Sequence, residues 1–439
     1  MIWHILRYWI TFVLPVFYKR IQGKNIKSIQ VKGPVIIAMN HPNAFTDPIL
    51  FTYLTFPIKV KYLARGDAFK PGFVAWFLTA IGVVPIFRIQ DGGKEGLKKN
   101  NDAYDLVNAF LKKNSKIIVF AEGLCVQENR LRPLKKGVSR MIFGAYDYLG
   151  ENNNLVVVPV GINYSKADKF RSTAFYNFGD AIPIKDFVEI YKENPAKANT
   201  NFLQYLAPKM KGLITHINNP ANDEAVKQIE TLCKKDRLIE LGLNYKDLNH
   251  DFIVLKELTE KVNAAEIEKP DLLSEFKIKA KDYFDLLKKN KLKDWLIDPK
   301  HKNKINNAHL FLRICLLIVG LPLYIIAFIG NYIPYTITEK LARKVIKNKE
   351  FYSSFAIAFG MIFFLLNYIL WFVFVYLFSP SIFMTLFICI LLMLCGWFSL
   401  YYRSFIKKTK GINTILKNKD LYNQLFVTRK ELLSLINKF

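Results

Sequence analysis

Paired cysteines are missing from this sequence of 439 residues. It has five cysteines, and no two of them form a CxxC motif: Cys125, Cys233, Cys315, Cys389 and Cys395. This usage predicts neither a disulfide framework nor a cysteine-based zinc site. We therefore expect the folded part of the chain outside its apolar segments to face a reducing compartment.

Motifs for nucleotides and metals are also absent. The turn Asp91-Gly92-Gly93 is not followed by the GK[ST] sequence of a phosphate-binding loop. The histidines apart from His41 show no ligand spacing: His4, His216, His250, His301 and His309. We therefore expect no metal and no bound cofactor.

Acidic residues are few, with 36 Asp and Glu against 63 Lys and Arg, and the formal net charge is +27. A strongly basic chain binds polyanions, either nucleic acid or an anionic membrane surface. Hydrophobic residues make up 51% of the chain, and the apolar excess lies in its last third. We therefore expect membrane lipids, and no nucleic acid, as partners.

Short apolar runs alternate with helical stretches such as 97–112 between residues 31 and 200. Most of these runs lack a clean alternation of apolar and polar residues, which is typical of a sheet buried on both faces. They lie at 35–39, 59–63, 83–87, 116–120 and 155–160. We therefore predict a layered α/β domain over residues 21–200.

Residues 201–300 predict a helical appendage. They are rich in Lys, Glu, Leu and Asn with helical spacing, as in 224–239 and 272–287, and prolines stand near the boundaries. We expect a membrane domain over 301–404 and a basic cytoplasmic tail over 405–439.

Three apolar segments occupy the membrane domain, at 309–333, 354–378 and 381–402. The last two exceed 20 residues without a charge, so each predicts a membrane-spanning helix. Basic residues flank this pair and both ends of the first segment, which indicates that all these flanks are cytoplasmic. We therefore predict that 309–333 re-enters the same side as a helical hairpin bent at Gly320–Pro322. An ordinary span with a proline kink is the alternative.

Residues 1–20 begin with an apolar stretch that Arg7 and Pro15 interrupt. The stretch is short for a membrane span and lacks the cleavage site of a signal peptide. We predict an interfacial, membrane-anchoring helix with Trp3 and Trp9 at headgroup depth. A core helix of the α/β domain is the alternative.

The sequence NHPNAFTD at residues 40–47 directly follows the predicted strand 35–39. Loops at strand ends are where α/β sheets place reactive groups. A carboxylate bonded to an imidazole orients it, and the imidazole can then take a proton from a hydroxyl. The step from His41 to Asp47 does not place both on one helical face, so they meet only if the segment is looped. Alternatively, Asp47 caps a helix that starts at Pro48.

Four blocks follow one another along the chain: NHPNAFTD at 40–47, GVVPIFR at 82–88, FAEG at 120–123 and VPVGI at 158–162. In this order and spacing they resemble the superfamily of glycerol-3-phosphate and lysophosphatidate acyltransferases. The resemblance implies a mixed-sheet acyltransferase domain, here followed by the helical appendage and C-terminal transmembrane helices.

The same resemblance implies roles for single residues. His41 is the general base and Asp47 its orienting partner. The implied substrate-binding residues are Asn40, Arg88 at the acceptor phosphate, Glu122 and Gly123 at the acceptor site, and Pro159 on the acyl-donor side. An arginine suits a phosphate because its planar guanidinium gives bidentate, charge-assisted bonds. Alternatively, Arg88 and Glu122 pair with each other, and Pro159 only ends or bulges a strand.

Two departures from the family pattern leave the acceptor less defined than the reaction. Five residues rather than four separate His41 from Asp47, so either the loop bulges or the pairing differs. The third block continues as Leu124 where the family has a threonine. The basic run at 130–136 fits phosphate or acyl-carrier contacts, or a solvated surface.

The expected function is that of a membrane-bound acyltransferase of phospholipid biosynthesis. Acyl-CoA or acyl-carrier protein would be the donor, and glycerol-3-phosphate or lysophosphatidate the acceptor. We expect a bacterial cytoplasmic membrane, with the catalytic domain on the cytoplasmic face. The alternatives are transfer to another lysolipid hydroxyl, such as that of a lyso-amino-acid lipid, and a non-catalytic basic lipid-binding protein.

Overall fold

A computed structural model describes residues 2–66, 69, 72–86 and 103–439, and the chain divides into two compact units. Unit 1 comprises Met1–Ile217, Tyr245–Lys256 and Asn348–Ser354. Unit 2 comprises Asn218–Asn244, Glu257–Lys347 and Phe355–Phe439. The predicted site residues all lie in the sequence of unit 1.

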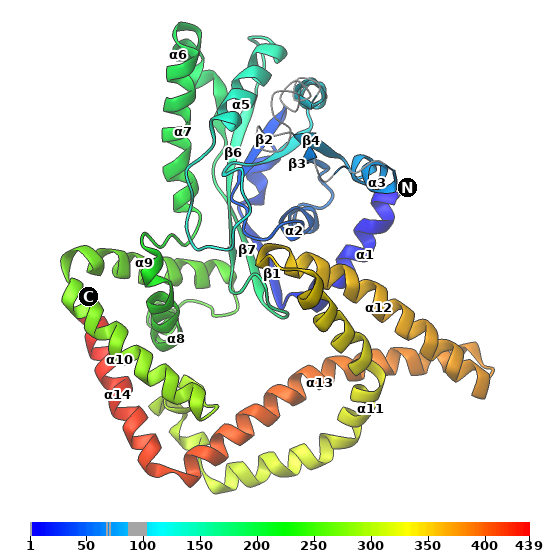
Figure 1. The fold of residues 1–439 in the computed structure, drawn as a ribbon, viewed down its shortest axis with the longest axis vertical. Coiled ribbons are helices and arrows are strands. Elements are labelled where there is room, and N and C mark those ends of the chain that lie inside the picture. Colours follow the sequence, from blue (N-terminus) through cyan, green and yellow to red (C-terminus); the bar gives the residue numbers. More distant parts are fainter. Residues whose placement is uncertain (1, 67–68, 70–71, 87–102) are drawn as a thin grey trace. The chain divides into compact units, whose positions relative to one another are not determined.

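Unit 1 contains an eight-stranded mixed sheet with the order β1-β7-β6-β2-β5-β3-β4, and β8 pairs with β6 (Figure 1). The pairs of β6 with β7 and with β8 are antiparallel, and the other pairs are parallel. The strands are β1 (Arg20–Lys24), β2 (Val35–Met39), β3 (Val60–Arg65), β4 (Val83–Ile86), β5 (Lys116–Phe120), β6 (Val156–Tyr164), β7 (Thr173–Phe178) and β8 (Ile182–Pro183). The predicted mixed-sheet α/β class is therefore confirmed.

Helices cover both faces of this sheet, which is why its strands read as continuous apolar runs. All five residues of β2 are buried. Ile36 and Ala38 belong to the core that α5 (Lys136–Leu149) and α7 (Pro195–Gly212) help to form. On the other face, Phe51 of α2 (Thr46–Leu54) packs against the rings of Tyr176 and Phe178. Unit 1 also includes α1 (Ile2–Phe17), α3 (Phe73–Ala80) and α6 (Val188–Glu193).

The boundary between the α/β domain and the helical appendage lies later than residue 200. Helix α7 crosses that point, and its Phe202, Leu206 and Met210 are buried in the sheet core. Residues 201–217 therefore belong to unit 1. The predicted helix 97–112 is present from 103 to 112, and its earlier residues lie outside the described part.

Unit 2 is helical. It contains α8 (Asp223–Glu240), α10 (Pro270–Lys289), α11 (Asn307–Val345), α13 (Ile382–Lys417) and α14 (Lys419–Asn437). Two further helices contribute residues to both units: α9 (Leu248–Glu268) and α12 (Lys349–Phe378). The helices predicted at 224–239 and 272–287 are present as α8 and α10.

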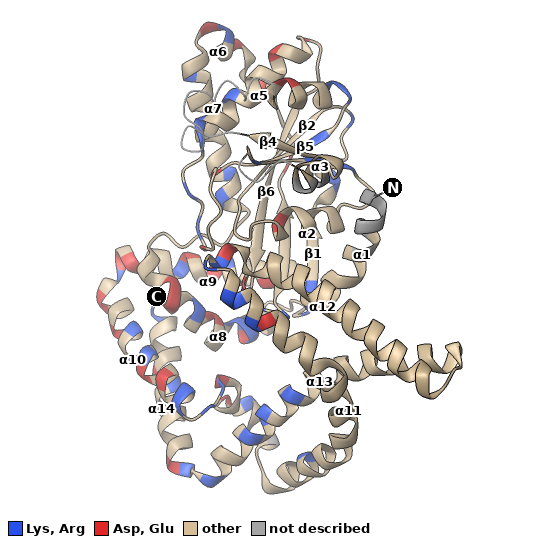
Figure 2. Cartoon of the chain, turned by 45° about the vertical axis from the view of Figure 1, so that its right-hand side comes forward, with Lys and Arg blue, Asp and Glu red and all other residues tan. Residues whose placement is uncertain are grey.

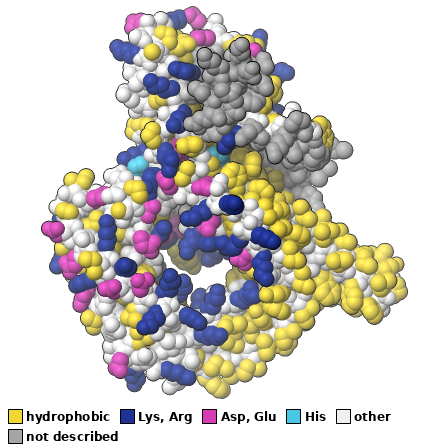
Figure 3. All heavy atoms as spheres, in the orientation of Figure 1, with side chains coloured by type: hydrophobic (Ala, Val, Ile, Leu, Met, Phe, Trp, Pro, Cys, Tyr) yellow, Lys and Arg dark blue, Asp and Glu magenta, His cyan; other side chains and the backbone are white. Residues whose placement is uncertain are grey.

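Three helices of the described chain, α11, α12 and α13, are long and apolar enough to cross a membrane. Figure 2 shows long stretches of α12 and α13 without charged side chains, and Figure 3 shows hydrophobic side chains over the surface of these helices. The predicted segments 309–333 and 354–378 lie within α11 and α12, and 381–402 covers the N-cap residue Ser381 and the first part of α13.

The hairpin predicted at Gly320–Pro322 is wrong, because α11 continues through Pro322 as one helix of 39 residues. Helix α13 packs along this stretch. A Cβ at Gly320 would lie 2.8 Å from the ring of Tyr402, and the Tyr402 hydroxyl donates to the carbonyl of Leu317. Glycine thus allows the close approach, and the neighbouring helix supports the turn before the proline.

The expected tail at 405–439 is ordered as helix. Residues 405–417 extend α13, and α14 packs in unit 2 through Leu425, Leu432 and Ile436. Within this packing the buried guanidinium of Arg429 pairs with Asp294 at 3.0 Å. The predicted basic tail therefore contains an amphipathic helix, α14, with one apolar face.

The N-terminal helix α1 has a buried face and an exposed face. A core helix requires the first, and an interfacial helix requires the second. Leu14 and Phe17 are buried, whereas Tyr8 and Phe12 are exposed. These two exposed aromatic residues stand four positions apart, on one side of the helix. The buried face belongs to the core of unit 1, and the interfacial role of the exposed face stays a prediction.

Candidate active site

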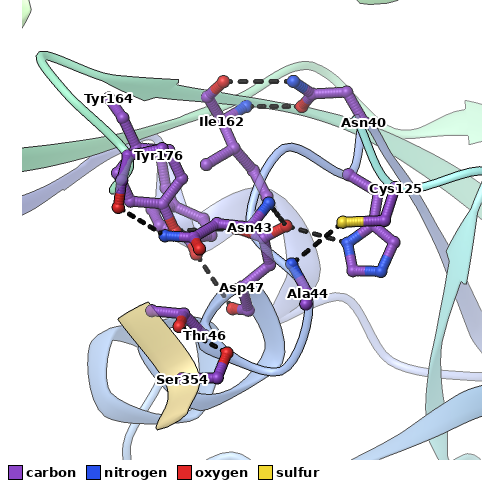
Figure 4. Close-up of polar contacts among 12 residues, drawn as sticks. Asn40, Asn43, Ala44, Thr46, Asp47, Cys125, Ile162, Tyr164, Tyr176 and Ser354 are labelled. Atoms are coloured by element: carbon purple, nitrogen blue, oxygen red, sulfur yellow. Dashed lines mark hydrogen bonds and ion pairs between the residues drawn. The ribbon is translucent and has the colours of Figure 1, made fainter. Parts of the chain in front are cut away.

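His41 lies just beyond the carboxyl end of β2, in the loop 40–45 that connects this strand to α2. The parallel neighbours β5 and β6 end near the same edge of the sheet. Parallel strands place the segments that follow them at a common edge, which is where α/β proteins assemble sites. Figure 4 shows the polar contacts around this loop.

The predicted pair is formed: Nδ1 of His41 lies 2.8 Å from Oδ2 of Asp47. The Asp47 side chain has no exposed surface, and that of His41 is 17% exposed. Because an ionised carboxylate only accepts, Nδ1 carries the proton and Nε2 keeps a free lone pair. The ring of Phe120 stacks on the imidazole at 3.6 Å between centroids, which fixes the ring plane. In this arrangement Nε2 could accept a proton.

The Asp47 carboxylate accepts two hydrogen bonds besides the one from His41. Its Oδ2 accepts the backbone N–H of Asn43 at 2.9 Å, and its Oδ1 accepts the hydroxyl of Tyr164 at 2.7 Å. The alternative in which Asp47 caps α2 is wrong, because the helix begins at Thr46 and the N-cap position is Phe45. The carboxylate is turned toward the histidine loop instead.

The extra residue between His41 and Asp47 is accommodated by a bulge. Ala44 has φ of +32°, a conformation that L-residues rarely adopt. Its N–H donates to Sγ of Cys125 at 3.0 Å. The loop thus bends at Ala44, and the pairing of histidine and aspartate keeps a normal hydrogen-bond length.

Two tyrosines at the site were not anticipated from the sequence. Tyr164 binds the Asp47 carboxylate, and the Tyr176 hydroxyl donates to the Asp47 carbonyl at 2.9 Å. Burial, reinforced by the Asp47 charge, raises the pKa of both phenols well above the usual range, so both remain donors. The only available signal was that Tyr164 follows the fourth block on the same strand face as Ile162.

Tyr164→Phe is expected to lower kcat about tenfold, because a hydrogen bond to a buried charge is lost while the histidine contact remains. Tyr176→Phe is the comparison, since that hydroxyl donates to the backbone carbonyl of Asp47 rather than to its carboxylate and should cost less. Initial-rate kinetics of both variants measure the difference. Equal losses in the two variants would contradict this role of Tyr164.

Glu122 connects the third block to the histidine. Its Oε2 accepts the N–H of Arg132 at 3.0 Å, and its carboxylate is also bonded by the backbone N–H of His41. Burial raises its pKa. Gly123 has φ of +65°, and a Cβ there would lie 3.0 Å from Lys135. Both residues therefore shape the loop around His41, and their contact with the acceptor stays a prediction.

The basic run at 130–136 is partly paired. The guanidinium of Arg132 bonds Glu128 at 2.7 Å, and Arg130 lies 3.8 Å from the same carboxylate. Arg88 and the end of the second block lie outside the described residues. Its role at the phosphate and its alternative pairing with Glu122 both stay predictions.

Asn40 and Pro159 have structural contacts. The Asn40 side chain donates to the carbonyl of Ile162 at 3.1 Å and accepts its N–H at 2.7 Å. These two hydrogen bonds hold the histidine loop against β6. Pro159 stays within β6 between its pairings with β8 and β7, where the partner strand changes, so it neither ends nor bulges the strand. Substrate contacts of both residues stay predictions.

Cys125 beside the loop is a neutral thiol. Burial, followed by the Asp47 charge, raises its pKa above the usual range. A covalent acyl-thiol route would need the thiolate, so the site favours direct transfer. Within the described ranges, no three His, Cys, Asp or Glu side chains gather as a metal site requires.

Comparisons with known proteins found similar acyltransferases. A family model described as Acyltransferase matches residues 20–163. Glycerol-3-phosphate O-acyltransferase 1 of Saccharomyces cerevisiae is 25% identical over 311 residues, covering 51% of this chain and 40% of that protein. The chloroplastic 1-acyl-sn-glycerol-3-phosphate acyltransferase BAT2 of Brassica napus is 27% identical over 135 residues, covering 30% and 36%. The chain thus spans well under half the length of these two relatives.

A solved structure is also similar. The crystal structure of the 1-acyl-sn-glycerophosphate acyltransferase PlsC from Thermotoga maritima has a TM-score of 0.35 and 14% identity, covering 48% of this chain and 79% of that one. The family match contains the histidine loop, the third block and most of β6. Residues 20–163 therefore match the Acyltransferase family, and the chain is similar to glycerol-3-phosphate and 1-acyl-sn-glycerol-3-phosphate acyltransferases.

Proposed function

We propose that this chain transfers a fatty acyl group from acyl-CoA or acyl-carrier protein to a hydroxyl of glycerol-3-phosphate or lysophosphatidate, in phospholipid biosynthesis. The observation that carries the proposal is the His41–Asp47 pair at 2.8 Å within the matched acyltransferase domain. It supplies a base beside a strand end without a nucleophilic serine or thiolate.

Transfer then proceeds in one displacement. Nε2 of His41 takes the proton of the acceptor hydroxyl as its oxygen attacks the thioester carbonyl. The C–O ester bond forms, the C–S bond breaks, and the departing thiolate receives the proton from the imidazolium. Asp47 stabilises the imidazolium during this interval and keeps Nδ1 protonated. The hydroxyl of Tyr164 donates a hydrogen bond to Oδ1, the second carboxylate oxygen of Asp47.

The proposed location is a membrane, of the bacterial cytoplasmic type, with unit 1 on the cytoplasmic side. Support comes from the three apolar helices α11, α12 and α13, and from the basic residues before α12 and after the apolar stretch of α13. Such a location suits a reaction that joins a lipid chain to a charged headgroup.

An acyl-transfer assay of the purified full chain tests the proposal. Each acceptor of a panel (glycerol-3-phosphate, lysophosphatidate and a lyso-amino-acid lipid) is offered with acyl-CoA and with acyl-carrier protein as donors. We expect thioester-dependent ester formation on a phosphate-bearing acceptor. Hydrolysis alone, with no acceptor esterified, would overturn the proposal.

A second class of acceptor, a lysolipid without a phosphate such as a lyso-amino-acid lipid, is favoured by one sequence feature. Leu124 stands where the third block of the family has a threonine. Arg88→Ala separates the two. For a phosphate acceptor we expect KM to rise by about tenfold or more, because a charge-assisted bidentate contact is lost. Rates on a lyso-amino-acid lipid without a phosphate should change little. A uniform effect on both acceptors would contradict the phosphate role of Arg88.

A further inference from the structure

The first turn of α12 contacts the histidine loop, although more than 300 positions separate the two in sequence. Residues Asn348–Ser354 belong to unit 1, whereas α12 continues from Phe355 into unit 2. Oγ of Ser354 lies 2.9 Å from Oγ1 of Thr46, and both side chains are buried (Figure 4). Thr46 directly precedes the aspartate of the pair.

A second bond reaches the same loop from Ser353, which has no exposed surface. Its hydroxyl donates to the carbonyl of Ala167. That carbonyl also accepts the Asn43 side-chain amide at 3.0 Å. Because the Asn43 backbone N–H binds the Asp47 carboxylate, the serine and the aspartate are joined through two residues.

Two further contacts join residues 349–354 to the surroundings of His41. The rings of Phe351 and Phe45 meet edge to face, with centroids 5.9 Å apart. The Gln127 amide, which follows the third block, donates to the carbonyl of Lys349 at 3.0 Å. The turn 349–354 therefore touches both loops that flank His41.

These contacts stabilise a strained part of the loop. Ala44 holds a positive φ that costs free energy and persists only where surrounding structure enforces it. Buried hydroxyls such as those of Thr46 and Ser354 stabilise one arrangement, because leaving either unbonded is costly. Helix α2 supplies Thr46, whereas its partner Ser354 comes from α12.

We infer, resting on the proposed function, that residues 349–354 are a positioning element of the acyl-transfer site. They hold the bulged loop 43–46 so that Asp47 faces His41. The uncharged run of α12 begins at Phe351 and already includes Ser353 and Ser354. The geometry of the pair is thereby coupled to the start of an apolar, membrane-type helix.

A double-mutant cycle in the full chain tests the inference. The variants are Ser354→Ala, Thr46→Val and both together, with kcat and KM measured in detergent micelles for the acceptor found active in the panel. We expect each single variant to lower kcat about tenfold with KM within about twofold, since misplaced catalytic groups slow chemistry more than binding. The double variant should be no slower than the slower single variant, because the two hydroxyls act as one unit.

Ser399→Ala is the matched control. That serine also lies in an apolar helix, α13, but its hydroxyl bonds only the carbonyl of Gly396 in the same helix. It should keep the wild-type kcat. Wild-type kcat in Ser354→Ala, or multiplied losses in the double variant, would overturn the inference.

Amide hydrogen exchange gives a reading that does not depend on turnover. In Ser354→Ala the amides of residues 43–50 should exchange at least several-fold faster than in wild type or Ser399→Ala. Unchanged exchange there would overturn the inference. The two proposals fail separately: activity that survives His41→Ala defeats the proposed function, whereas activity that needs His41 but not Ser354 defeats only the positioning role.

Discussion

His41→Ala is expected to lower kcat by about 10²–10⁴-fold, the usual contribution of a positioned general base. The acceptor hydroxyl would then have to lose its proton to water. The His41 side chain is mostly buried against Phe120. KM for both substrates should change little, since the imidazole acts on the transition state.

A second histidine–aspartate pair in unit 1 provides the control. Nε2 of His250 lies 3.8 Å from Oδ2 of Asp247, and both side chains are about one-third exposed. His250→Ala removes the same side chain from the same unit without approaching the loop, and should leave kcat unchanged. Membrane extraction and thermal unfolding should match wild type in both variants. Wild-type turnover in His41→Ala would end the proposed mechanism and favour a non-catalytic lipid-binding role.

The sequence was sufficient to locate the pair but not its support. A buried strand followed by NHPNAFTD predicts a strand-end loop, and the structure has this loop after β2. The bonds from Tyr164, Tyr176 and Ser354 come from residues at least 117 positions away from Asp47 or Thr46. No local period or motif encodes such contacts, because they depend on how the strands and helices are ordered in space.

Other differences have equally local causes. Residues 201–212 of α7 were predicted to belong to the appendage because the segment 201–300 is rich in Lys, Glu, Leu and Asn, yet Phe202, Leu206 and Met210 occupy the sheet core. Gly320 and Pro322 predicted a break, but side chains of α13 support the α11 backbone there. In both cases tertiary packing outweighed local preference.

Asp47→Asn should reduce kcat by about a hundredfold, and Asp47→Ala by roughly a further tenfold, through different physical losses. The backbone N–H of Asn43 points at Oδ2, so an asparagine at 47 places its amide oxygen there. That oxygen still accepts from Nδ1 of His41 and preserves the useful tautomer. The amide nitrogen then faces the Tyr164 hydroxyl, which can turn and accept. Only the charge that stabilises the imidazolium is lost.

The alanine variant loses the charge and the orienting acceptor together, so His41 can rotate and exchange its tautomer. A buried carboxylate is costly to desolvate, so Asp47→Asn should unfold at the same temperature as wild type or a higher one, while its activity falls. Asp247→Asn, in the partly exposed pair, is the control and should leave the activity unchanged. Initial rates and thermal unfolding of the four proteins decide the matter: an asparagine variant as slow as the alanine variant would mean that the tautomer was not kept, and the hydrogen-bond arrangement assigned to Asp47 would be wrong.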